Sequence, residues 1–155
     1  MKLILMRHAK SDWSDPGQED RDRPLNERGR LAAARIGDWL RSRRHLPDAV
    51  LCSDAARTRE TLQALDLEGG PVDYDGALYL AEADTVLEKA RARAEGCVLL
   101  IGHNPGLAEA ATRVVATAPT HPEFARFPSG ACLVVDLPDE RPGRVLDFVV
   151  PRDLA

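Results

Sequence analysis

Six short apolar runs recur along the chain, and each has the length of a buried β-strand. The stretches between several of these runs carry apolar residues at helical spacing instead. Strand and helix patterns therefore alternate along most of the sequence. The predicted strands are Lys2–Met6, Ala49–Cys52, Val72–Tyr74, Cys97–Ile101, Ala131–Leu137 and Val145–Val150.

Four helices are predicted between the strands. The first follows Asn26, a good N-cap residue, and extends to about Arg43. Its apolar face would consist of Leu31, Ala32, Ile36, Trp39 and Leu40. The other three are expected from an N-cap at Ser53 to about Leu65, from an N-cap at Asp84 to about Ala94, and from Asn104 and Pro105 to about Ala116.

This alternation is typical of an α/β fold. Strands that alternate with helices form a mostly parallel sheet with helices on both faces, so we expect a three-layer α/β/α sandwich. The two strands after Pro128 have no helix between them and should form an antiparallel edge. Because the sequence contains neither an internal repeat nor a linker, we expect a single domain over residues 1–155.

Composition narrows the functional classes. Hydrophobic residues make up 44% of the 155 positions and charged residues 30%, which is the balance of an ordinary globular protein and too apolar for a disordered one. The net charge of -4 argues against a nucleic acid partner, because phosphate-backbone binding requires a basic surface. Any anion site must therefore be a local cluster of positive charge.

The same sequence indicates a cytoplasmic protein. The apolar run before Arg7 is too short for a signal peptide, and no stretch is long enough to span a membrane. Cys52, Cys97 and Cys132 are widely spaced within apolar runs and lack metal-ligand spacing. We expect them to be buried free thiols in a reducing compartment, with no membrane partner.

Three segments that carry polar chemistry follow predicted strands directly. Arg7 and His8 follow the first strand, Ser53 to Arg57 follow the second, and Gly102 to Gly106 follow the fourth. Ligands of open α/β sheets bind at the carboxyl ends of strands, so these segments should meet in one pocket. The pocket would contain two arginines and two histidines, and helix N-termini there also favour an anion. This combination predicts a phosphate site.

Helical geometry separates two arginines of the second helix. Arg57 and Thr61 are four residues apart and share a face, whereas Arg59 points about 160° away from Arg57. Arg57 is therefore the candidate for the pocket and Arg59 a surface residue. A second basic cluster is best explained as a solvated helix end, and it comprises Arg41, Arg43, Arg44 and His45.

These motifs, in this order, resemble the histidine phosphatase superfamily, which includes the phosphoglycerate mutases. More detailed matches resemble its small SixA-type phosphohistidine phosphatase branch, nearly from end to end. The Arg-His pair alone is a weak signal, but the ordered set is specific. The matching segments are Arg7-His8-Ala9-Lys10-Ser11, Arg23-Pro24-Leu25-Asn26-Glu27-Arg28-Gly29, Ser53-x3-Arg57-x3-Thr61, Gly102-His103-Asn104-Pro105-Gly106 and Phe148-Val149-Val150-Pro151-Arg152-Asp153-Leu154.

The resemblance implies a phosphoglycerate mutase-like fold and a specific chemistry. His8 would be the nucleophile that forms a covalent phosphohistidine intermediate. Arg7, Arg57 and His103 would bind the phosphoryl oxygens and stabilise their charge, with no metal and no cofactor. Arg23 lies near the phosphate pocket in that branch, although an ion pair with Asp20 or Asp22 explains it equally well.

The general acid is a separate question. Ester-cleaving members of the superfamily carry a Glu or Asp after the third strand, and Glu82 is the candidate here, although its context is not the usual acid motif. Asp84 is better explained as a helix N-cap. A phosphohistidine substrate would need the acid less, because its P–N bond is labile and its imidazole leaving group is readily protonated.

Three functions remain open at this point. The first is a phosphatase that removes the phosphoryl group from phosphohistidine on a protein and releases inorganic phosphate. The second is a hydrolase of small phosphomonoesters, and the third is a phosphate-binding module without catalysis. A mutase fits less well, because it must protect its phosphorylated form from water and the chain has little length for a lid.

Overall fold

A six-stranded sheet forms the centre of the structure, a computed structural model that describes residues 1–68 and 70–155. The strand order is β3-β2-β4-β1-β5-β6. The pairs β1–β4, β2–β4 and β2–β3 are parallel, whereas β5 is antiparallel to both neighbours, which confirms the antiparallel edge. The strands are β1 Lys2–Arg7, β2 Ala49–Ser53, β3 Val72–Asp75, β4 Cys97–Gly102, β5 Cys132–Asp136 and β6 Arg144–Val149.

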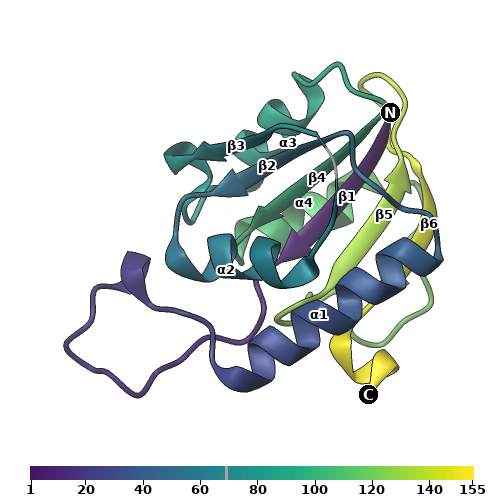
Figure 1. Cartoon of the computed structure of the whole chain (residues 1–155). Coiled ribbons are helices and arrows are strands. Elements are labelled where there is room, and N and C mark those ends of the chain that lie inside the picture. Colours follow the sequence, from purple (N-terminus) through teal and green to yellow (C-terminus); the bar gives the residue numbers. More distant parts are fainter. Residues whose placement is uncertain (69) are drawn as a thin grey trace.

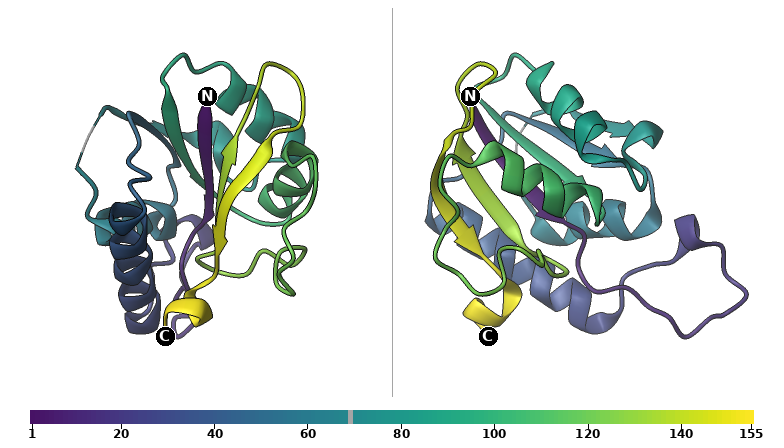
Figure 2. Two further views of the ribbon diagram at one scale, coloured as in Figure 1. Left: turned by 90° about the vertical axis from the view of Figure 1, so that its right-hand side faces the viewer. Right: turned by 180° about the vertical axis from the view of Figure 1, so that it is seen from behind.

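Helices cover both faces of this sheet, which confirms the three-layer α/β/α prediction. Figure 1 labels the helices, and Figure 2 shows that α1 (Glu27–Ser42) and α2 (Ala56–Leu65) lie on one side of the sheet. The helices α3 (Ala83–Arg91) and α4 (Gly106–Val114) lie on the other side. Short 3-10 helices occur at η1 Asp20–Asp22, η2 Gly76–Leu78 and η3 Pro151–Leu154.

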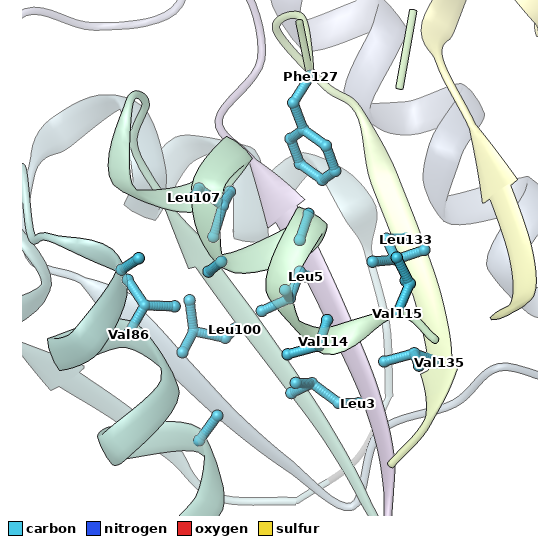
Figure 3. Packing of buried hydrophobic residues seen from close by; sticks show 14 of the residues in the cluster. Leu3, Leu5, Val86, Leu100, Leu107, Val114, Val115, Phe127, Leu133 and Val135 are labelled. Carbon is cyan, nitrogen blue, oxygen red and sulfur yellow. The ribbon is translucent and has the colours of Figure 1, made fainter. Parts of the chain in front are cut away.

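The central strand β1 shows why the layers form. Successive side chains of a strand point to opposite faces. Leu3 and Leu5 accordingly pack with α3 and α4, in the cluster of Figure 3, whereas Ile4 and Met6 pack with α1 and α2. All four side chains are fully buried, so the apolar run of β1 contributes to two cores at once.

Two of the predicted helix caps are wrong. Asn26 does cap α1, since its side chain accepts a hydrogen bond from the Gly29 amide at 2.7 Å. Ser53, however, belongs to β2, and α2 begins three residues later behind an Ala55 N-cap that makes no side-chain bond. The hydroxyl of Ser53 bonds to a side chain across the sheet edge instead, so tertiary contact outweighs local capping.

The starts of α3 and α4 also differ from expectation. Asp84 lies inside the first turn of α3, where it pairs with Arg113, and Glu82 occupies the N-cap position without a side-chain bond. For α4 the N-cap is Pro105, one residue later than predicted. The side chain of Asn104 still accepts a hydrogen bond from the Ala108 amide at 3.2 Å, so it caps the helix from one position upstream.

The cysteines agree with the sequence analysis, whereas the basic helix end is only partly solvated, since His45 is buried. All three cysteines are buried free thiols, and burial raises the pKa of Cys52 to about 12. At the end of α1, Arg43 and His45 both contact the carboxylate of Asp147. These basic residues thus have partners within the protein. Within residues 1–68 and 70–155, no helix is long and apolar enough to cross a membrane.

Candidate active site

The carboxyl ends of three adjacent strands bring the predicted segments together. Arg7 pairs with Gly102 across β1 and β4, and Cys52 pairs with Ile101 across β2 and β4. The residues that follow these strands therefore meet at one edge, where they surround a cavity of about 390 Å³. Its lining comprises Arg7, His8, Lys10, Ser11, Trp13, Asp20, Arg23, Arg57, Leu80, His103, Asn104 and Ser129.

His8 is buried and fixed in this cavity. Its Nδ1 lies 2.7 Å from the carbonyl oxygen of Ala9, so Nδ1 carries the proton and donates. The amide of Ala9 in turn donates to the hydroxyl of Thr61 at 3.0 Å. Burial, aided by the positive charge of Arg7 and Arg57, lowers the pKa of His8 to about 3. The ring is therefore neutral near pH 7, with a free lone pair on Nε2.

His103 lies beside it, at the end of β4. The two imidazole rings have centroids 5.4 Å apart. The Nε2 of His103 shares a hydrogen bond of 2.7 Å with the hydroxyl of Ser53, the residue that sequence reasoning assigned to a helix cap. Burial and the charge of Arg57 lower the pKa of His103 to about 4, so this ring is neutral as well.

The buried guanidinium group of Arg57 and the half-buried one of Arg7 complete the predicted cluster. Arg57 is only 2% exposed and donates to Asp20 twice, to the main-chain oxygen at 2.6 Å and to the carboxylate at 2.9 Å. Arg7 donates to the main-chain oxygen of Phe127 at 3.4 Å, and burial together with Arg57 lowers its pKa. Within the described residues, three buried atoms of the cluster have no hydrogen-bond partner, namely Arg7 Nε, Arg57 Nε and His103 Nδ1. Such unpaired groups favour binding of an anion.

Asp20 is the main residue that the sequence analysis did not assign to the site. Its carboxylate accepts hydrogen bonds from Arg57, from Arg23 at 2.8 Å and from the hydroxyl of Tyr79. These donors hold the pKa of Asp20 well below its usual range, with Tyr79 as the largest cause. From the sequence, Asp20 is considered only as an ion-pair partner of Arg23, because no sequence pattern links it to Tyr79, which lies beyond β3.

Arg23 satisfies both interpretations of its role. It is 7% exposed, lines the cavity and donates to the hydroxyl of Ser11, as a pocket residue would. It also forms the ion pair with Asp20 that was the alternative. The ring of Trp13, which is largely exposed, stacks on the Arg23 guanidinium at 3.6 Å.

Two residues lie away from the cavity. Arg59 is exposed, donates to the main-chain oxygen of Asp54 at 2.9 Å and stacks on Tyr74, so the helix-face prediction is confirmed. Glu82 is also exposed and is not part of the cavity lining. It lies in a neighbouring hollow with Glu109, at the start of α3.

The chemistry of this site is that of an anion pocket. A neutral imidazole with a free Nε2 lies beside the fixed guanidinium groups of Arg7, Arg23 and Arg57. Guanidinium groups match phosphate oxygens in bidentate geometry. Within the described part of the chain, no group of three or more His, Cys, Asp or Glu side chains is arranged to hold a metal ion.

Comparisons with known proteins agree with this geometry. Residues 3–85 match the model of the histidine phosphatase superfamily (branch 1). A protein of unknown function from Mycobacterium tuberculosis is 35% identical over 95% of this chain and 100% of its own length. The chain is thus related to that protein over 95% of its own length, and about half of it matches the family model directly.

Solved structures show the same fold. A candidate phosphohistidine phosphatase SixA from Agrobacterium tumefaciens superposes with a TM-score of 0.84, at 33% identity over 97% of this chain and 98% of that one. A second candidate SixA, from Nakamurella multipartita, superposes with a TM-score of 0.81, at 32% identity over 97% of this chain and 95% of that one. A phosphoglycerate mutase from Thermus thermophilus shares the fold with a TM-score of 0.59 at 19% identity, covering 97% and 99%. The chain belongs to the histidine phosphatase superfamily, with a phosphoglycerate mutase-like fold and SixA-type structural neighbours.

Proposed function

We propose that this protein is a phosphohistidine phosphatase that uses His8 as its nucleophile. The observation that carries the proposal is the state of His8 in the cavity. Its Nδ1 proton is bound by the Ala9 carbonyl, its Nε2 lone pair is free, and its ring is neutral near pH 7. A neutral imidazole beside buried guanidinium groups is suited to attack a dianionic phosphoryl group.

In the first step, Nε2 of His8 attacks phosphorus in line. A new P–N bond forms while the bond from phosphorus to the leaving group breaks, and the leaving group departs with its electron pair. Arg7, Arg57 and Arg23 donate to the equatorial oxygens, and Nδ1–H of His103 donates too if the Ser53 hydroxyl donates to its Nε2. In the second step water attacks the phosphoryl group on His8, which releases inorganic phosphate and restores the free imidazole.

The protonation state of the carboxylate in the cavity favours phosphohistidine over an alkyl phosphate ester as the substrate. Among the described residues that line the cavity, Asp20 is the only carboxylate, and its lowered pKa keeps it ionised near pH 7. It therefore has no proton to give to a leaving alcohol. A phosphohistidine substrate needs no proton on the nitrogen of the P–N bond that breaks. The second nitrogen of its ring accepts a proton from water, and neutral imidazole then leaves. The SixA titles of the structural neighbours point the same way.

Turnover on two substrates tests the proposal. We expect the protein to dephosphorylate a histidine-phosphorylated protein faster than a simple aryl phosphate, with kcat/KM compared under identical conditions. Faster turnover of the aryl phosphate would favour a hydrolase of small phosphomonoesters. Binding of phosphate without turnover of either substrate would favour the non-catalytic module.

The nucleophile has a test of its own. His8→Ala should lower kcat to below about 1% of the wild-type value, because loss of a covalent nucleophile costs several orders of magnitude. The wild-type protein should be mixed briefly with labelled substrate and quenched at alkaline pH, because phosphohistidine is acid-labile. Peptide mass spectrometry should then locate the phosphoryl group on His8. Label on His103, or higher activity in a folded His8→Ala variant, would contradict the assignment.

A further inference from the structure

A second hollow adjoins the candidate active site. It has a volume of about 330 Å³ and shares Lys10 and Ser129 with the lining of the first cavity. Four cationic residues line it, namely Lys10, Arg28, Arg126 and Arg152, against the single carboxylate of Glu123. This excess of positive charge lies on a protein whose net charge is -4, so it is a local feature of the fold and does not reflect overall composition.

Most of the positive charges around this basic hollow have no acidic partner in the part of the protein that the structure describes, so they are free to bind an anion. Among the described residues, Lys10, Arg28 and Arg152 form no ion pair, and Arg126 approaches Glu123 only to 3.6 Å. Arg113, by contrast, pairs with the carboxylate of Asp84 at 2.5 Å. A set of unpaired cations around one hollow costs self-repulsion, which a bound anion would relieve.

The walls of the hollow are fixed relative to His8. Gly29, in the first turn of α1, approaches the main chain so closely that an added Cβ would lie 2.0 Å from the Lys10 oxygen. Next to Ser129 of the lining, Gly130 has φ of +78°, and a Cβ there would lie 2.7 Å from the ring of Pro151. The Gly130 amide also donates to the His8 main-chain oxygen at 3.0 Å. Close backbone contacts thus join α1, η3 and the nucleophile segment.

We infer that this basic hollow binds a carboxylate of the substrate protein, on a residue that flanks the phosphorylated histidine. The inference rests on the proposed function. Lys10 follows His8 by two residues, so the hollow begins within about 7 Å of the nucleophile along the chain. A Glu or Asp side chain two or three positions from a phosphohistidine spans a similar distance. Complementary charge at such a site selects among partners.

Phosphohistidine peptides with different flanks test this inference. One peptide carries Glu at the two positions on each side of the phosphohistidine, and its partner carries Gln at the same positions. We expect kcat/KM to be about threefold to tenfold higher for the Glu peptide, the range that two exposed ion pairs supply. In the double variant Arg28→Gln/Arg152→Gln the ratio of kcat/KM for the Glu peptide to that for the Gln peptide should fall close to one. In Arg28→Glu/Arg152→Glu the ratio should fall below one.

The matched control is Arg35→Gln/Arg144→Gln. Both arginines are exposed, lie outside the two cavities and form no ion pair among the described residues, so the control removes the same charge elsewhere. It should retain the Glu preference, and thermal unfolding should show that all variants are folded. Equal turnover of both peptides by the wild type, or equal loss of preference in the control, would overturn the inference alone. Failure to cleave any phosphohistidine peptide would overturn the proposed function and the inference with it.

Discussion

His8 and His103 show how a few contacts determine the reactivity of one side chain. Each ring is nearly fully buried, and each forms one short hydrogen bond, His8 to the Ala9 carbonyl and His103 to the Ser53 hydroxyl. Burial removes the water that would stabilise an imidazolium, and the neighbouring arginines repel one. Both rings are consequently neutral over the pH range in which a free histidine would be half charged.

Neutral buried histidines make the stability of the protein depend on pH. In the unfolded chain both rings titrate near pH 6.5, whereas in the folded protein His8 titrates near 3 and His103 near 4. Below pH 6.5 the unfolded state therefore binds more protons than the native state, and the free energy of unfolding falls as the pH falls. At pH 5 the loss is about 2 kcal/mol for each histidine. Urea unfolding at pH 7 and pH 5, in phosphate-free buffer, should show this difference.

A non-titrating variant supplies the control for this measurement. His8→Asn should reduce the difference between pH 7 and pH 5 by about half, because only His103 then contributes. Equal unfolding free energies of the wild type at both pH values would show that the rings are not held neutral.

Helix α2 is the element that places Arg57 in the site. It begins three residues after the end of β2, at the carboxyl edge of the sheet, and its buried face carries Arg57 and Thr61. The hydroxyl of Thr61 donates to the Arg57 main-chain oxygen at 2.7 Å and accepts from the Ala9 amide. One helical face thus supplies a guanidinium for the pocket and a hydrogen bond that fixes the nucleophile segment.

Two arginines of α2 should behave differently in anion binding. Arg57→Ala should weaken the binding of phosphate or vanadate by about tenfold or more, because a charge-assisted hydrogen bond in a buried site is lost. Arg59→Ala removes the same charge from the exposed face and should change the affinity less than twofold. Isothermal titration calorimetry measures both. Similar losses in the two variants would mean that net charge, and not the position of Arg57, controls binding.

Glu82, the N-cap residue of α3, is the candidate general acid of the sequence analysis. Glu82 lies outside the cavity lining, so Glu82→Gln should change phosphohistidine turnover by less than about threefold. If Glu82 protonated the leaving group of an ester, the same variant would slow release of a poor leaving alcohol by about a hundredfold, and release of nitrophenolate far less. Steady-state kinetics on these three substrates separates the cases. A large loss on phosphohistidine would make Glu82 a general catalytic residue.

At the scale of the whole molecule, the site depends on segments that are distant in sequence. The segment between β1 and α1 extends away from the sheet in Figure 1 and carries Asp20 in η1. Asp20 contacts Arg57 of α2, Arg23 before α1 and Tyr79 beyond β3. Its carboxylate thus occupies two of the guanidinium groups that a phosphoryl group would need, so substrate must compete with it.

Removal of this competing charge should strengthen anion binding. Asp20→Asn keeps the shape of the side chain but removes its negative charge, and inorganic phosphate should bind about fivefold more tightly, as expected for a like charge about 4 Å away in water. Asp22→Asn is the matched control, since Asp22 is exposed in the same η1 turn and is not part of the cavity lining. Weaker binding in Asp20→Asn would show instead that Asp20 positions Arg57 and Arg23.

The strands, the layers and the residues at the strand ends could all be predicted from the amino-acid sequence. Apolar runs and helical spacing are local patterns, and parallel strands with intervening helices allow few arrangements, so the meeting of Arg7, His8, Arg57 and His103 could be predicted. The face of α2 that carries Arg57 followed from helical geometry alone. The single domain over residues 1–155 stays a prediction.

Which of the competing local signals the chain uses depends on contacts across the fold. Ser53 and Asp84 are good N-cap residues, yet Ser53 bonds to His103 and Asp84 pairs with Arg113, because contacts across the fold competed with capping. The position of Asp20 between Arg57 and Tyr79 depends on how an irregular segment folds back over the sheet edge. No periodic pattern encodes such a path, so side-chain partners in loops could be identified only in three dimensions.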